Sequence, residues 1–97
     1  MELDKTIYMA DLFSIYKNLL TKKQIAVCTE FYINNLGLSE IAANLGVTRQ
    51  AVMDALKKAN MQLNDFEKKL KLKNKFGEIE KLTDSKLKNE ILDILYK

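Results

Sequence analysis

The segment LSEIAANLGVTRQAVMDALKKA, residues 38–59, decides which fold we expect of this chain. Apolar residues recur at three- and four-residue spacing on both sides of Gly46, which predicts two helices joined by a tight turn. Ser39 and Thr48 are expected to cap these helices, with Glu40 near the positive end of the first. The side chains expected to hold the pair together are Ile41, Ala42, Leu45, Val47, Val52 and Leu56.

The 97 residues of the whole chain fit one small domain. No proline and only three glycines interrupt a sequence rich in good helix formers, which predicts an all-α fold. The net charge of +3 permits a polyanionic partner without requiring one. With one cysteine, Cys28, and no histidine, neither an intrachain disulfide nor a Cys/His zinc site is possible, and we expect no metal and no cofactor.

Catalysis is not expected, because the chain lacks histidine, a glycine-rich phosphate loop and clustered carboxylates with an activating partner. The N-terminus MELDKTIYMADLF does not follow the pattern of a secretory signal. No apolar stretch is long enough to span a bilayer. We therefore expect a non-enzymatic, cytoplasmic protein without membrane insertion.

Further helices are expected on both sides of the central pair. Apolar spacing predicts a helix over residues 4–20, a second over 22–34 that begins with a Thr21/Gln24 capping box, and a last one over 84–96. Left-handed backbone angles are expected in NNLG, residues 34–37. The predicted inner faces are Tyr8, Leu12, Ile15, Tyr16 and Leu19; then Ile25, Cys28, Phe31 and Tyr32; then Leu87, Ile91, Ile94 and Leu95, with Thr83, Asp84 and Ser85 as caps of the last helix.

The helix that follows Thr48 is expected to be long, because no breaker occurs before Gly77. About 29 helical residues would span roughly 43 Å, more than the width of a globule of this size. Either the far half of this helix folds back against the first helix or, as we prefer, a second chain covers it. We accordingly expect a helix-turn-helix domain with an extended helix over residues 1–77, and a C-terminal helix over 78–97 that packs on the same domain or on the partner. Apolar residues follow a heptad spacing along this helix, at Val52, Leu56, Ala59, Leu63, Phe66 and Leu70. The predicted homodimer seam consists of Leu56, Leu63, Phe66 and Leu70.

The polar face of this helix is the candidate nucleic-acid surface. Arg49 can grip a phosphate or the edge of guanine, and Gln50 can pair with adenine. Asp54 opposes binding unless it accepts from cytosine or pairs with a lysine. The candidate binding residues are Thr48, Arg49, Gln50, Met53, Lys57 and Lys58 on this helix, with Lys22 and Lys23 extending the surface.

Two observations keep a protein-binding or purely structural interpretation open. Between residues 38 and 56 the charges are Glu40, Arg49 and Asp54, which sum to −1. Positive charge gathers farther along, in FEKKLKLKNK at residues 66–75, where five lysines stand against one glutamate. This stretch is either a solvated helix face or a basic ridge that follows phosphates, with Lys68, Lys69, Lys71 and Lys73 as its members.

LTKKQIAVCTEFYINNLGLSEIAANLGVTRQAVMDAL is similar to region 4 of bacterial sigma factors, a helix-turn-helix that reads promoter DNA. A closer resemblance is to the YlxM family of small bacterial proteins, carried by LFSIYKNLLTKKQ (12–24), FYINNLGLSEIA (31–42), VTRQAVMDALKK (47–58) and LNDFEKKLKL (63–72). It extends over residues 7–72, so the tail beyond Gly77 is expected to lie outside it. Met53 stands where we would expect an aromatic residue.

The resemblance implies an all-helical homodimer joined through its extended helices. It also implies a regulatory component of the signal recognition particle pathway, whose partner would be the particle RNA or its GTPase. The alternative is a dimeric transcription regulator that places two recognition helices about 34 Å apart on double-stranded DNA.

Overall fold

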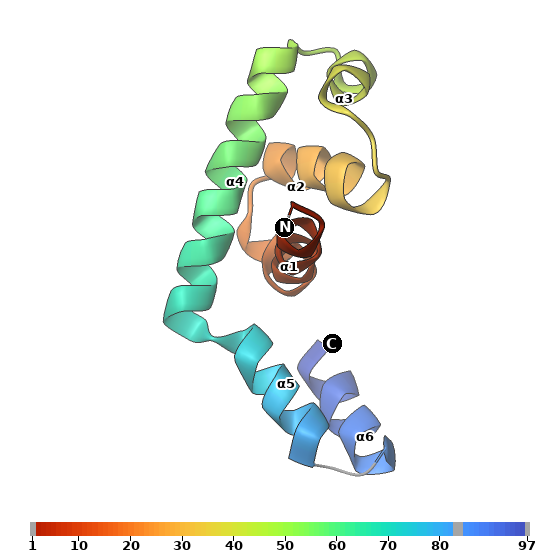
Figure 1. Ribbon diagram of the computed structural model, residues 1–97, viewed down its shortest axis with the longest axis vertical. Coiled ribbons are helices and arrows are strands. Elements are labelled where there is room, and N and C mark those ends of the chain that lie inside the picture. Colours follow the sequence, from red (N-terminus) through yellow and green to blue (C-terminus); the bar gives the residue numbers. More distant parts are fainter. Residues whose placement is uncertain (1, 83–84, 97) are drawn as a thin grey trace.

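The computed structural model describes residues 2–82 and 85–96, except for the side chains at 2–3, 82, 85–88 and 91–92. All regular structure in these ranges is helical, as the composition predicted. The molecule measures 47 × 28 × 23 Å, and its long axis follows α4 and then the α5–α6 pair (Figure 1). The elements are α1 (Glu2–Tyr16), η1 (Lys17–Leu19), α2 (Lys22–Cys28), η2 (Thr29–Ile33), α3 (Leu38–Leu45), α4 (Arg49–Leu70), α5 (Leu72–Leu82) and α6 (Ser85–Tyr96).

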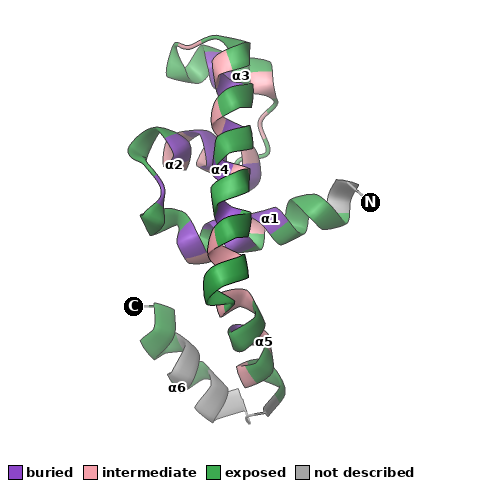
Figure 2. Cartoon of the chain, turned by 90° about the vertical axis from the view of Figure 1, so that its left-hand side faces the viewer, coloured by how far each residue is buried: buried purple, intermediate pink, exposed green. Residues whose placement is uncertain are grey.

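Helix α4 is the spine on which α1, α2 and α3 pack (Figures 1 and 2). Its inward stripe of Val52, Leu56, Ala59 and Leu63 is buried by the chain's own helices. One chain therefore already covers most of the seam that we assigned to a dimer, and Leu56 and Leu63 belong to the core of the monomer. Of the other two seam residues, Phe66 is half-buried against Tyr16, with ring centroids 5.8 Å apart, and Leu70 is 44% exposed.

The first helix is α-helical only as far as Tyr16, because the chain then tightens into the 3₁₀ turn η1. Because the winding of the helix changes here, the residue that points into the core is one position later in the sequence than predicted. Leu20 enters the core and Leu19 is 57% exposed, so the prediction that Leu19 faces inward was wrong. Tyr8, also predicted to face inward, is 40% exposed, and the buried face of α1 consists of Met9, Leu12, Phe13 and Tyr16.

The second helix begins as predicted and ends differently. Thr21 Oγ1 accepts from Gln24 N at 3.2 Å, and Gln24 Oε1 accepts from Thr21 N at 3.0 Å, which confirms the capping box. From Thr29 to Ile33 the helix widens to π geometry, and Asn34 N donates to Thr29 O. Asn35 has a φ of 56°, so the left-handed backbone expected in this loop is confirmed.

The long helix does not reach Gly77. It ends at Leu70, and Lys71 takes a left-handed φ of 54° before α5 begins at Leu72. Tyr16 Oη accepts from Leu72 N at 3.0 Å and donates to Glu67 Oε1 at 2.7 Å, while Lys73 N donates to the same Glu67 oxygen at 3.1 Å. The turn is thus held by a hydroxyl 56 residues away in the sequence, and Gly77 lies inside α5.

The far end of the chain is only partly described. Helix α6 packs against α5, and the rings of Phe76 and Tyr96 lie 4.8 Å apart. Ile94 and Leu95, predicted to face inward, are exposed. The expected packing side chains Leu87 and Ile91 and the expected caps Thr83, Asp84 and Ser85 lie outside the described residues and side chains.

Candidate nucleic-acid interface

The turn before α4 fixes the direction in which its first residues point. Gly46 closes α3 with a φ of 67°, which costs little without a Cβ, and Val47 N donates to Ala42 O at 3.0 Å. Thr48 Oγ1 then accepts from Ala51 N at 3.0 Å, as predicted for the cap of α4. At the other end of α3, the cap is Gly37 and not Ser39, because Glu40 Oε1 reaches back to accept from Gly37 N at 3.2 Å. Leu45, expected on the inner face of α3, is 37% exposed.

All the α4 residues that we predicted as nucleic-acid contacts are exposed on the side away from the core (Figure 2). Arg49 Nη1 lies 3.7 Å from Met53 Sδ, one helical turn farther along α4, so the guanidinium lies along the surface of the helix. Gln50 Nε2 donates to Asp54 Oδ1 at 2.9 Å. Asp54 therefore binds a neighbouring amide rather than a lysine, and Gln50 is left with Oε1 as an outward acceptor.

Two shallow hollows flank this exposed face. The first, of about 420 Å³, lies between the start of α2 and α4, and both Lys23 and Lys58 line it. Lys22 is exposed but does not line it. The residues that line it are Thr21, Lys23, Gln24, Ala51, Asp54, Ala55 and Lys58.

The second hollow, of about 430 Å³, lies on the other flank of α4, against η2 and the start of α3. Sequence reasoning missed three of its residues: Phe31 and Asn60 were not considered as surface groups, and Leu38 was not singled out. No sequence pattern pointed to these three residues, because the hollow forms only when η2 packs beside α4. Its lining is Phe31, Leu38, Gln50, Met53, Asp54, Leu56, Lys57 and Asn60.

A break in the helix at Lys71 interrupts the predicted basic ridge. Lys69 Nζ pairs with Asp65 at 3.0 Å on α4, and Lys71 occupies the left-handed break. Lys73, beyond the break, pairs with Asp11 at 3.5 Å and lies 5.7 Å from the Tyr8 ring centroid. Lys68 remains exposed on α4. The turn at Lys71 thus separates lysines that a continuous helix would have aligned.

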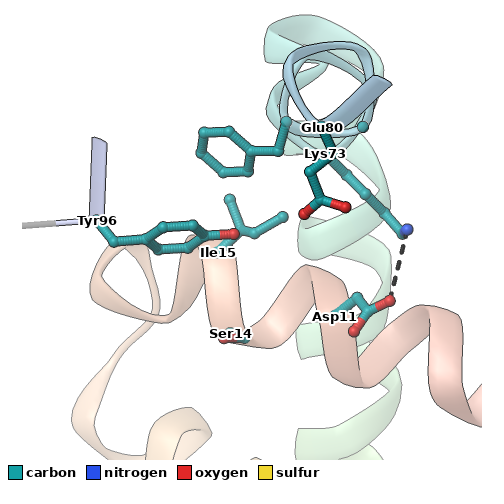
Figure 3. A pocket seen from close by; sticks show the side chains of 8 residues that line it. Asp11, Ser14, Ile15, Lys73, Glu80 and Tyr96 are labelled. Atoms are coloured by element: carbon teal, nitrogen blue, oxygen red, sulfur yellow. Dashed lines mark ion pairs between the residues drawn. The ribbon is translucent and has the colours of Figure 1, made fainter. Parts of the chain in front are cut away.

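The ion pair of Lys73 closes one side of a hollow of about 270 Å³ between α1, α5 and α6 (Figure 3). Glu80 and Tyr96 face the same space. Burial, with Glu80 and Asp11 adding to it, raises the pKa of the Tyr96 phenol above its ordinary value. The ion pair with Asp11 of α1 leaves Lys73 less available to a phosphate than the exposed Lys57, Lys58 and Lys68 of α4.

In the described ranges, none of the helices combines the length and the apolar character that a membrane-spanning segment needs. Nor do the described residues bring together three or more Cys, Asp or Glu side chains that could hold a metal ion. The polar face of α4, with a hollow on each of its flanks, is thus the candidate nucleic-acid-binding surface.

A short helix, a glycine turn and a second helix with an exposed polar face define a helix-turn-helix protein. A family model described as "UPF0122: Putative helix-turn-helix protein, YlxM / p13 like" matches residues 3–95, and the chain belongs to this family. The match reaches through α6, so the expectation that the tail falls outside the family was wrong. The chain is 43% identical over 89 residues, 92% of its own length and 80% of theirs, to UPF0122 proteins of Bacillus cereus (strain AH187), Bacillus anthracis (strain A0248) and Bacillus thuringiensis subsp. konkukian (strain 97-27).

Proposed function

We propose that this chain is a non-enzymatic nucleic-acid-binding protein whose contact surface is the exposed face of α4. The observation that carries the proposal is the position of Arg49, Gln50 and Lys57. They project from a helix whose opposite side is buried by α1, α2 and α3, so the backbone beneath them is rigid. A helix presented in this way can enter a groove without rearrangement of the fold.

The charges around this face favour phosphate contacts. Lys23 and Lys58 meet at the hollow beside α2, and Lys57 lies on the other flank of α4. Asp54 is the carboxylate between them, and the amide of Gln50 already satisfies one of its oxygens. Lysines on both flanks of a helix are placed to contact the two backbones that border a groove.

As the biological setting we propose the cytoplasmic signal recognition particle pathway, in which the protein acts as an accessory or regulatory component. The support is membership of the YlxM-like family together with a surface of separated lysines. RNA duplexes are recognised mostly through shape and phosphate contacts, which such a surface provides. The partner would be the RNA of the signal recognition particle. The GTPase of the particle is the protein partner that should be tested in the same experiments.

The second candidate is a dimeric DNA-binding regulator. The exposed apolar side chain of Leu70 at the end of α4 favours it, because a second copy could cover it. Phe66 is half-buried and would contribute at the edge of such a contact. In this version the two copies of α4 would contact successive turns of double-stranded DNA.

Fluorescence anisotropy with a particle-RNA hairpin and a duplex DNA, at several salt concentrations, tests the proposal. The double variant Lys57→Ala/Lys58→Ala should weaken binding and lower the slope of log affinity against log salt by up to about 2. Lys75→Ala/Lys81→Ala, which removes two exposed lysines of α5, is the matched control and should change little. Equal losses in the two double variants would refute α4 as the contact surface.

Arg49→Ala separates the two candidates. Loss of preference for one DNA sequence would favour the regulator, since Arg49 would then read base edges. A uniform loss over unrelated RNA hairpins would favour the phosphate-contact version. Light scattering at micromolar concentration adds the oligomeric state, and a strict monomer would count against the regulator.

A further inference from the structure

We propose that the hollow between η2, α3 and α4 receives a single unpaired base of a structured RNA. The inference rests on the proposed function and extends it from a surface to a binding pocket. With about 430 Å³, the hollow is within the range of roughly 300–1,000 Å³ typical of small-ligand pockets. It lies directly beside the first three turns of α4 and so adjoins the proposed phosphate contacts.

The walls of the hollow are suited to the flat face of a base. Phe31 belongs to the π-helical segment η2, a geometry that recurs at functional sites. Its ring packs edge-on against Tyr32 at 5.0 Å and 84°, which fixes its orientation. Met53, 41% exposed, and Leu38 complete an apolar surface. Such exposed apolar area beside a cationic helix is the setting in which bases stack on side chains.

Two amides place polar groups at the edge of this apolar surface. The Tyr32 hydroxyl donates to Asn60 Oδ1 at 2.7 Å, which leaves the Asn60 amide nitrogen as a donor. The contact of Gln50 Nε2 with Asp54 leaves Gln50 Oε1 as an acceptor. A donor and an acceptor held by the protein itself match the mixed donor and acceptor edge of an unpaired base.

The charges at the hollow favour a nucleotide as the occupant. Lys57 lines the hollow and Arg49 lies against Met53 at its margin, so the phosphates on either side of an inserted base would meet a cation. Asp54 is the carboxylate in the lining, and one of its oxygens accepts from the Gln50 amide. A base within a duplex is stacked on both faces and cannot offer one to Phe31. Structured RNA presents bulged and loop bases for recognition, so we assign the pocket to RNA.

The test compares two RNA hairpins that differ only by one bulged adenosine in the stem, with a DNA hairpin carrying the same bulge as a third probe. The native protein should bind the bulged RNA about tenfold more tightly than the paired RNA, the gain expected from one stacked base. Met53→Ala and Phe31→Leu should each reduce this ratio. Lys58→Ala should lower both RNA affinities by the same factor and keep the ratio, because it lies at the other hollow.

Each outcome decides something. Equal affinity for the two RNA hairpins would overturn the base pocket while the proposed nucleic-acid binding stands. Equal affinity for bulged RNA and bulged DNA would overturn the assignment to RNA. Absence of binding to all three hairpins would overturn the proposed function together with the pocket. Circular dichroism of Phe31→Leu checks its folding, and the exposed Met53 gives a second variant that does not disturb the core.

Discussion

Replacing Tyr16 with phenylalanine should destabilise the protein by about 2 kcal/mol, because the phenol joins α1 to the turn between α4 and α5. Its hydroxyl donates to Glu67 at 2.7 Å and accepts from Leu72 N at 3.0 Å, while the ring is 1% exposed. A hydrogen bond to a charged group contributes about 1.5–3 kcal/mol and a neutral one about 0.5–1.5 kcal/mol. Glu67 keeps its bond from Lys73 N, which places the expected loss near the lower end of the sum.

Urea unfolding followed by circular dichroism measures this change, and the thermal midpoint should fall by about 10 °C for a domain of this size. Tyr8→Phe is the matched control on the same helix. Tyr8 is 40% exposed, and phenylalanine retains the ring that lies under Lys73, so the control should stay within about 0.5 kcal/mol of the native protein. A Tyr16→Phe variant as stable as the control would refute the claim that this hydroxyl holds the turn.

Three further predictions concern backbone strain and pH. Lys71→Gly should stabilise the protein by about 1 kcal/mol in urea unfolding, because it relieves the φ of 54°, and Lys71→Ala, which removes the charge but keeps the Cβ, should not. Gly46→Ala should cost about 1 kcal/mol from its φ of 67° alone, since no atom lies within 4 Å of the added Cβ; a neutral result would contradict the strain argument. Burial, aided by the hydrogen bond to Glu67, raises the pKa of Tyr16 to about 12 from 10.0 in the unfolded chain. The Tyr16 contribution to the free energy of unfolding should therefore be complete below pH 10 and lost between pH 10 and 12, a decline that Tyr16→Phe should reduce in pH-dependent unfolding.

Local hydrogen bonding made much of the fold predictable. The caps at Thr21 and Thr48 and the turn at Gly46 depend on residues within a few positions of each other, so their sequence signatures suffice. The cap of α3 was misassigned because Ser39 has the right chemistry, yet Gly37 takes the position and Glu40 supplies the hydrogen bond. Chemistry alone could not tell which of two nearby residues adopts the cap geometry.

The end of α4 was not predictable from local sequence. Lys71 is neither glycine nor asparagine, and the bonds that hold its left-handed turn come from Tyr16 in α1 and from Glu67. That error carried over to the basic ridge, because the break moves Lys73 toward Asp11. The assignment of the dimer seam was a separate error, because the chain buries its inner residues Leu56 and Leu63 by itself.

The exposed face of α4 was predictable, since it is the complement of an apolar stripe with helical spacing. The hollow beside it was not. It depends on the π turn that places Phe31 next to Met53, and on the tyrosine that orients Asn60. Helical periodicity predicts which face of a helix each residue occupies. A pocket depends in addition on how two helices are placed relative to each other, which periodicity does not give.

Whether α4 recognises the nucleic acid can be decided from the backbone amide shifts of isotopically labelled protein titrated with the bulged RNA hairpin. We expect the largest shifts on residues 48–58 of the cap and first turns of α4, with further shifts at Phe31 and Leu38. Shifts confined to α5 and α6, or spread evenly over the lysine-bearing surface, would contradict α4 as the recognition element.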